Sequence, residues 1–201
     1  EDEYWRRLEE AVRDFNILVK VKPSSSSDES GRESMAHYLT KAFIVKYLVD
    51  NIARELRGRG LSEEDALRKA IDCVETEYES PQSSKSPQGS VRFDTYVKPD
   101  CVSAFSGLVI EVETLYGTGT IVHKLLNTIE SRVKVASRLW IVVPNPQAVI
   151  YLPLLLKLRN SVKANYKGKE IEFYTLDLSS GKLVKLIDMA KAIVNRVSKG
   201  E

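Results

Sequence analysis

Residues 91–114 read V-R-F-D-T-Y-V-K-P-D-C-V-S-A-F-S-G-L-V-I-E-V-E-T and are the most informative part of the chain. Side chains two residues apart on a β-strand point to the same face of a sheet. The β-like run 107–110 leads into Glu111 and Glu113, which therefore face the same way. Asp100, on or just before the neighbouring strand, can meet both across a hairpin. Three carboxylates so close repel one another, and a hard divalent cation, Mg²⁺ or Mn²⁺, is the usual reason to assemble them.

The composition describes a globular protein with one real core. The chain has 201 residues, of which 43% are hydrophobic and 29% charged. No apolar run approaches the roughly 20 residues that span a bilayer, and the acidic start is unlike a signal peptide. Cys73 and Cys101 lack metal-ligand spacing, so we expect reduced cysteines in a cytoplasmic (intracellular) protein, with a disulfide as the alternative.

Hydrophobic periodicity predicts a mixed α/β chain. An N-terminal helix and a Ser-rich loop occupy residues 1–30, and a single larger unit occupies residues 31–201. We expect strands at 91–97, 100–105, 108–113, 139–143 and 171–176, and helices at 1–18, 31–58, 62–78, 121–136, 145–160 and 182–197. The apolar face of the last helix predicts core packing. Dimerisation through that face, or through Trp5 and Phe15, is a second hypothesis.

This pattern resembles the PD-(D/E)xK nuclease superfamily. The resemblance rests on Pro99-Asp100, then a β-run ending in Glu111-Val112-Glu113, then a helix, and it covers residues 31–176. It extends to Glu33 in the first core helix, where members often place a glutamate near the metal. The resemblance implies a restriction-endonuclease-like mixed β-sheet flanked by helices. It also implies metal-dependent hydrolysis of phosphodiester bonds in duplex or branched DNA, often by a homodimer.

The chain departs from the family pattern at one position. The pattern ends in lysine, and Glu113 stands there. The resemblance implies that a lysine from a nearby element can take over, and Lys124 on the following helix is our candidate. Lys98, beside Pro99, is another, and His123 lies near a position where some members carry glutamine. If no such residue reaches the site, the chain would bind nucleic acid without cutting it.

Phosphodiester hydrolysis assigns a role to each candidate. Asp100 and Glu111 would bind Mg²⁺ or Mn²⁺, and the Val112 carbonyl and Glu33 would complete the ligands. Glu113 would bind metal or act as general base on water, and Lys124 would hold the scissile phosphate. Asp94 is a minor alternative ligand.

Residues 131–169 carry eight basic residues and no acidic one. A basic stretch beside an acidic cluster suits a polyanion held against metal. We therefore predict DNA contacts at Lys157, Arg159 and Lys163, with Lys98 and His123. Two alternatives stay open: a catalytically inactive nuclease-fold module for DNA binding or assembly, and an α/β protein with no nucleic-acid role whose basic residues lie on solvated helix faces.

Overall fold

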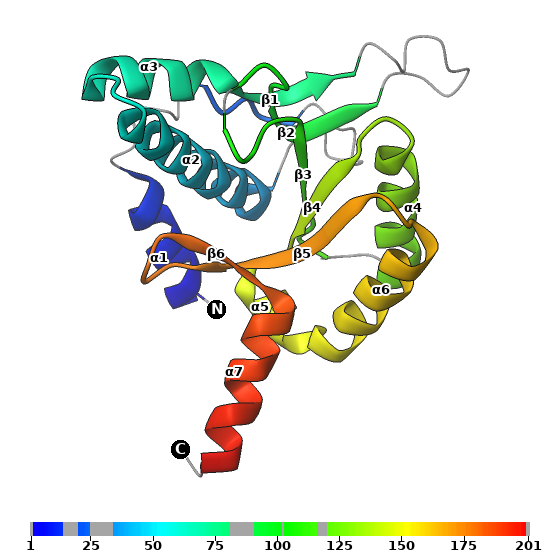
Figure 1. The fold of residues 1–201 in the computed structure, drawn as a ribbon. Helices are drawn as coiled ribbons and strands as arrows, with labels where there is room; N and C mark the ends of the chain where they lie inside the picture. The colour runs from blue at the N-terminus through cyan, green and yellow to red at the C-terminus, as the bar shows by residue number, and fades with distance from the viewer. Residues whose placement is uncertain are drawn as a thin grey trace.

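The computed structural model describes residues 2–13, 20–24, 34–80, 91–101, 103–115 and 120–199. These residues form a mixed α/β fold with a six-stranded mixed sheet and seven helices (Figure 1). The mixed α/β expectation is therefore confirmed.

The sheet keeps its strands in sequence order. The strands are β1 (Val74–Glu79), β2 (Arg92–Val97), β3 (Leu108–Val112), β4 (Arg138–Val142), β5 (Glu170–Asp177) and β6 (Lys182–Lys185). Strands β1, β2 and β3 form an antiparallel meander, β3, β4 and β5 are parallel, and β6 returns antiparallel to β5. The two parallel pairs are joined by helical crossovers, as parallel pairing requires.

Helices cover both faces of the sheet (Figure 1). The helices are α1 (Asp2–Arg13), α2 (Met35–Gly58), α3 (Glu63–Cys73), α4 (Ile121–Val133), α5 (Asn145–Ile150), α6 (Leu152–Asn165) and α7 (Leu186–Lys199). Helices α1, α2 and α3 lie on one side, and α4 and α6 lie on the other. The long α2 forms much of the core on its side, with Leu48, Val49 and Ile52 fully buried. No described helix combines the length and the apolar character that crossing a membrane requires.

The meander differs from the sequence prediction in which segments form it. Residues 74–78, expected to end a helix, lie in β1. Residues 100–105, expected to form a strand, lie in turns apart from the undescribed residue 102. The sequence V-E-T-E-Y-E alternates with period two, and its β-branched Val74 and Thr76 are buried, which favours a strand. Pro99 has no N–H to donate to a sheet ladder, so β2 ends at Val97.

The C-terminal segment also differs from its prediction. Residues 182–185 form β6, and the helix begins only at Leu186, the one buried residue of α7. Helix α7 extends away from the body of the protein (Figure 1). Its apolar residues Ile193, Val194 and Val197 are 40%, 62% and 72% exposed. The expectation that this apolar face packs in the core is confirmed for Leu183 and Leu186, which are buried, and is wrong for the part of the face beyond them.

Smaller boundaries shift for local reasons. Helix α2 begins at Met35 because the Ser34 hydroxyl accepts a hydrogen bond from the His37 N–H, which caps the helix. The predicted helix 145–160 is interrupted at Tyr151, and Pro153 lies in the first turn of α6, where its missing N–H is tolerated.

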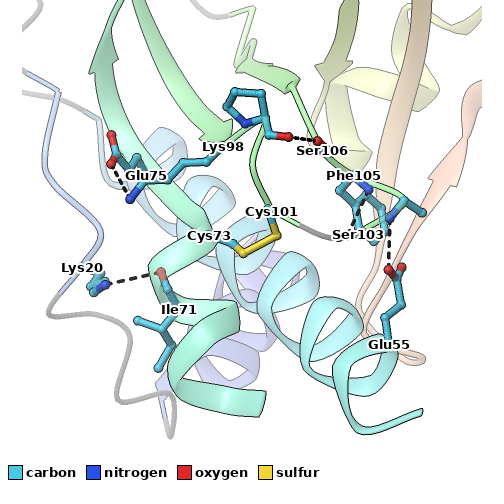
Figure 2. Close-up of a disulfide and its surroundings, with 12 residues drawn as sticks. Lys20, Glu55, Ile71, Cys73, Glu75, Lys98, Cys101, Ser103, Phe105 and Ser106 are labelled. Atoms are coloured by element: carbon cyan, nitrogen blue, oxygen red, sulfur yellow. Dashed lines mark hydrogen bonds and ion pairs between the residues drawn. A yellow bond between two sulfur atoms is a disulfide. The ribbon is translucent and has the colours of Figure 1, made fainter. Parts of the chain in front are cut away.

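A disulfide joins Cys73 to Cys101 (Figure 2). It connects the junction of α3 and β1 to the turn after β2, across a sequence separation of 28. The expectation of two reduced cysteines is wrong, because the β1–β2 pairing brings Val74 opposite Val97 and so places the two cysteines together.

Candidate functional site

Three acidic residues lie at one end of the β2–β3 pair. The register pairs Tyr96 with Val109 and Thr95 with Ile110, and the next step brings Asp94 opposite Glu111. Glu113 follows two residues later, directly after the end of β3. Glu111 and Glu113 are each only 4% exposed. The structure therefore builds an acidic cluster of half-buried Asp94 with buried Glu111 and Glu113.

Asp94 is held in place by the backbone of β3 and by α2. The Val112 N–H donates a hydrogen bond of 2.8 Å to Asp94 Oδ2. His37 Nε2 lies 3.2 Å from the same oxygen. The first contact ties the Asp94 carboxylate to β3, and the second ties it to α2. The position of this carboxylate therefore depends on the packing of α2 over the sheet.

Glu111 is bound by a guanidinium from α4. Arg132 Nε and Nη2 donate to the two Glu111 oxygens at 2.8 and 3.1 Å. Burial, together with the negative charge of Asp94, raises the pKa of Glu111 to about 8, and the bonds from Arg132 only partly offset this. A buried acid with a raised pKa beside other carboxylates is typical of functional sites.

Glu113 is held by the same helix. The Thr128 hydroxyl donates to Glu113 Oε1 at 2.7 Å, and Lys124 Nζ lies 3.3 Å from Oε2. Lys124, Thr128 and Arg132 are four residues apart, so they share one face of α4. The predicted proximity of Lys124 and Glu113 is therefore present in the structure.

A second buried ion pair lies beside the acidic cluster. Lys41 is fully buried, and its Nζ donates to Glu77 Oε1 at 2.7 Å. Glu77 lies between Thr76 and Tyr78, which pair with Thr95 and Phe93, so it neighbours Asp94 in the β1–β2 register. Its backbone φ of 52° is positive, which is uncommon for a residue other than glycine. Strand β1 thus carries a buried ion pair of its own, next to β2 in the sheet.

Asp100 does not join this cluster, which corrects the placement expected from the sequence. It follows β2 in a turn and lies toward the start of β3, whereas Glu111 lies near the end of β3. The cause is the antiparallel register, which brings Asp94 rather than Asp100 opposite Glu111. Lys98 lies in the same region as Asp100, next to the disulfide, and forms an ion pair of 3.0 Å with Glu75 (Figure 2).

The predicted DNA contacts are spread over several surfaces. Arg159 and Lys163 of α6 both donate to buried Glu172 of β5, so each has a carboxylate partner. Although burial opposes it, hydrogen bonds from Arg159 and Lys163 lower the pKa of Glu172 to about 2. Lys157 is exposed on α6, and His123 is exposed on α4 beside Lys124. Glu33, the expected ligand from the first core helix, lies outside the described residues.

Part of the network could have been found in the sequence. Asp94 and Tyr96 are two residues apart on β2, so they share a face of the strand. Lys124, Thr128 and Arg132 follow one another at intervals of four residues, as side chains on one face of a helix do. The ion pair of Lys41 with Glu77 could not be predicted from the sequence pattern, because Glu77 lies on a strand that the sequence predicts as helix.

The oxygen donors of the cluster suit a hard divalent cation in kind. Across the described part of the chain, however, no group of three or more His, Cys, Asp or Glu side chains is arranged to hold a metal ion. Both Glu111 oxygens accept hydrogen bonds from Arg132, so a metal ion at Glu111 would have to share the carboxylate with the guanidinium.

Comparison with known proteins finds no family model, no curated protein and no solved structure that matches this chain. The described residues form a mixed α/β fold whose β2–β3 pair carries the acidic cluster of Asp94, Glu111 and Glu113.

Proposed function

We propose that the chain is a divalent-metal-dependent DNA endonuclease with a restriction-endonuclease-like fold, in which Asp94 takes the place expected for Asp100. The observation that carries the proposal is the pair of half-buried Asp94 and buried Glu111 on adjacent strands, followed by buried Glu113. The fold expected from the resemblance has the order helix, three strands, helix, strand. Helix α2, the meander β1–β3, α4 and β4 follow this order, and this supports the proposed fold; α3, between α2 and β1, is the one additional element.

Each residue of the cluster has a defined task in this proposal. Asp94, Glu111 and the Val112 carbonyl would hold Mg²⁺ or Mn²⁺, and the ion would supply an activated water and neutralise phosphate charge. Glu113, oriented by Thr128, would accept a proton from the attacking water. Lys124, whose side chain is 40% exposed, would hold the scissile phosphate.

A specific observation favours a second candidate, a DNA-binding or assembly module that does not cut. Glu111 is bound bidentately by Arg132, and Glu113 is bound by Thr128 and Lys124. A cluster whose charges are already compensated by the protein can serve structure alone.

A cleavage assay on supercoiled plasmid with Mn²⁺ or Mg²⁺ tests the proposal. We expect nicking by the wild type, loss of nicking in Asp94→Asn and Glu111→Gln, and retained nicking in Asp100→Ala, which changes an acid at the opposite end of β2. Circular dichroism confirms that each variant is folded.

The outcomes separate the candidates. Loss of cleavage in Asp100→Ala with retention in Asp94→Asn would reverse the assignment. A wild type that shifts the plasmid on a gel but leaves it intact would support the binding module. A wild-type protein that neither shifts nor cuts the plasmid would reject both candidate functions on nucleic acid.

We also propose that a second copy of the chain packs on α7. The support is the exposed apolar row Ile193, Val194 and Val197 on a helix that extends from the body (Figure 1). Contiguous exposed apolar residues mark interaction surfaces more often than free surface. Val149 and Ile150 of α5 are also exposed, at 57% and 68%.

A further inference from the structure

A cavity of about 190 Å³ lies between α1, α2 and the turn that joins β5 to β6. It is separate from the acidic cluster, because Asp94, Glu111 and Glu113 do not line it. Much of its wall comes from one face of α2, where side chains three and four residues apart lie together, and from the start of β6. The polar side chains of this wall include Lys46, Tyr47, Asp50, Asn51, Arg54 and Lys182.

Positive charge exceeds negative charge in this cavity. Asp50 is the one acid among the described residues that line it, and Lys46 Nζ already donates to Asp50 Oδ2 at 2.6 Å. Arg54 and Lys182 form no ion pair with a carboxylate in the described part of the chain. The wall therefore presents two positive charges that no described acid compensates, and such an arrangement attracts an anion.

The guanidinium of Arg54 is oriented by the helix that carries it. The backbone carbonyl of Tyr47 accepts a hydrogen bond of 2.7 Å from Asn51 Nδ2, and Asn51 Oδ1 accepts one of 2.9 Å from Arg54 Nη1. This uses a single N–H of the guanidinium fork, so the others stay available for a ligand. Because the amide already holds the side chain, less conformational entropy is lost when an anion binds to it.

The Tyr47 phenol adds a neutral donor to the same wall. Its hydroxyl has no hydrogen-bond partner among the residues that the structure describes. Burial raises the pKa of Tyr47, and the positive charge of Arg54 opposes this shift. A phenol with a raised pKa stays protonated at neutral pH, so its O–H can donate to an anion bound beside Arg54.

We propose that this cavity binds the phosphate group of a phosphate monoester. Such a group carries close to two negative charges at neutral pH, because its second pKa is about 6, and it therefore matches the charge of Arg54 and Lys182. The planar guanidinium can bind two phosphate oxygens at once. Lys182 would act as a point charge, and the Tyr47 hydroxyl would donate to the remaining oxygen.

The phosphodiester backbone of nucleic acid fits this cavity less well. Each of its phosphates carries a single negative charge and has fewer free oxygens than a monoester. The inference is also independent of the proposed nuclease activity, since it uses no residue of the acidic cluster.

Titration calorimetry of the full chain with methyl phosphate, in chloride at constant ionic strength, tests the inference. We expect saturable binding at one site, with an affinity that rises as the pH passes through about 6, where the dianion forms. Dimethyl phosphate, a diester with a single charge, and succinate, a dicarboxylate without the tetrahedral group, should each bind at least about tenfold more weakly.

Four variants locate the site. Arg54→Gln should weaken the binding of methyl phosphate at least about tenfold, because it removes a charge-assisted bidentate contact, and Lys182→Gln should weaken it several-fold. Tyr47→Phe keeps the ring that packs edge-on against Phe105 and removes only the hydroxyl, so a loss of about threefold is expected. Arg59, the C-cap residue of α2, is exposed and does not line the cavity. Arg59→Gln is therefore the matched control for charge and should leave the affinity unchanged.

Several results would overturn the inference. One is a wild type that shows no saturable binding of methyl phosphate. Another is an equal loss of affinity in Arg54→Gln and Arg59→Gln, because overall charge would then be responsible. Full binding in both Arg54→Gln and Lys182→Gln would place the phosphate outside this cavity. Affinity for dimethyl phosphate or succinate equal to that for methyl phosphate would reject the monoester as the class of ligand.

Discussion

Removal of the Cys73–Cys101 disulfide should lower the stability of the protein by about 3.5 kcal/mol. The value follows from the sequence separation of 28, through the loss of chain entropy when the unfolded chain carries a closed loop of that length. For a domain of this size, that change lowers the melting temperature by roughly 7 to 14 °C. The disulfide joins β1 to the turn after β2, so its loss acts on the meander that carries Asp94.

The assay is thermal unfolding of the oxidised wild type, the reduced wild type and the Cys73→Ala/Cys101→Ala variant, with thiol counting by mass spectrometry. Reductant should destabilise the wild type and leave the variant unchanged, which separates the crosslink from the packing of buried Cys101. A wild type that contains two free thiols when isolated under oxidising conditions would refute the pairing. A disulfide whose reduction leaves the melting temperature unchanged would refute the entropic reasoning.

Two further predictions concern pH and assembly. Because the pKa of Glu111 is raised from 4.5 to about 8, the folded state holds a proton between these values that the unfolded state has lost. The contribution of Glu111 to the free energy of unfolding is therefore greatest below pH 4.5 and falls as pH rises to 8. Urea titrations across this range should show the decline in the wild type and a flatter profile in Glu111→Gln; equal profiles would contradict the raised pKa. Val194→Glu, which places a charge on the exposed face of α7, should convert a dimer to a monomer in light scattering, with Lys199→Glu as a control for charge. A wild type that is monomeric at high concentration would reject the dimer.

Local sequence patterns predicted much of the fold correctly. The alternation of residues 108–113 placed Glu111 and Glu113 on one side of a strand, and α4 and β4 formed close to where periodicity predicted them. The periodicity that predicts these elements is local, although β3 and β4 are held in place by pairing between distant residues such as Leu108 and Arg138. Residues 74–78 were mistaken for the end of a helix because a six-residue strand is too short for its period to be unambiguous.

The α/β character of this protein and the shared direction of Glu111 and Glu113 can be predicted from the sequence, because both follow from the local periodicity of strands and helices. Which aspartate meets these glutamates depends on the three-dimensional fold. Asp94 and Asp100 are both close to β2, and the choice depends on the strand register, which is fixed by packing across the whole meander. The disulfide and the exposure of α7 depend on long-range placement in the same way. The binding of Glu111 by Arg132 does too, because it joins residues that are 21 positions apart on different elements.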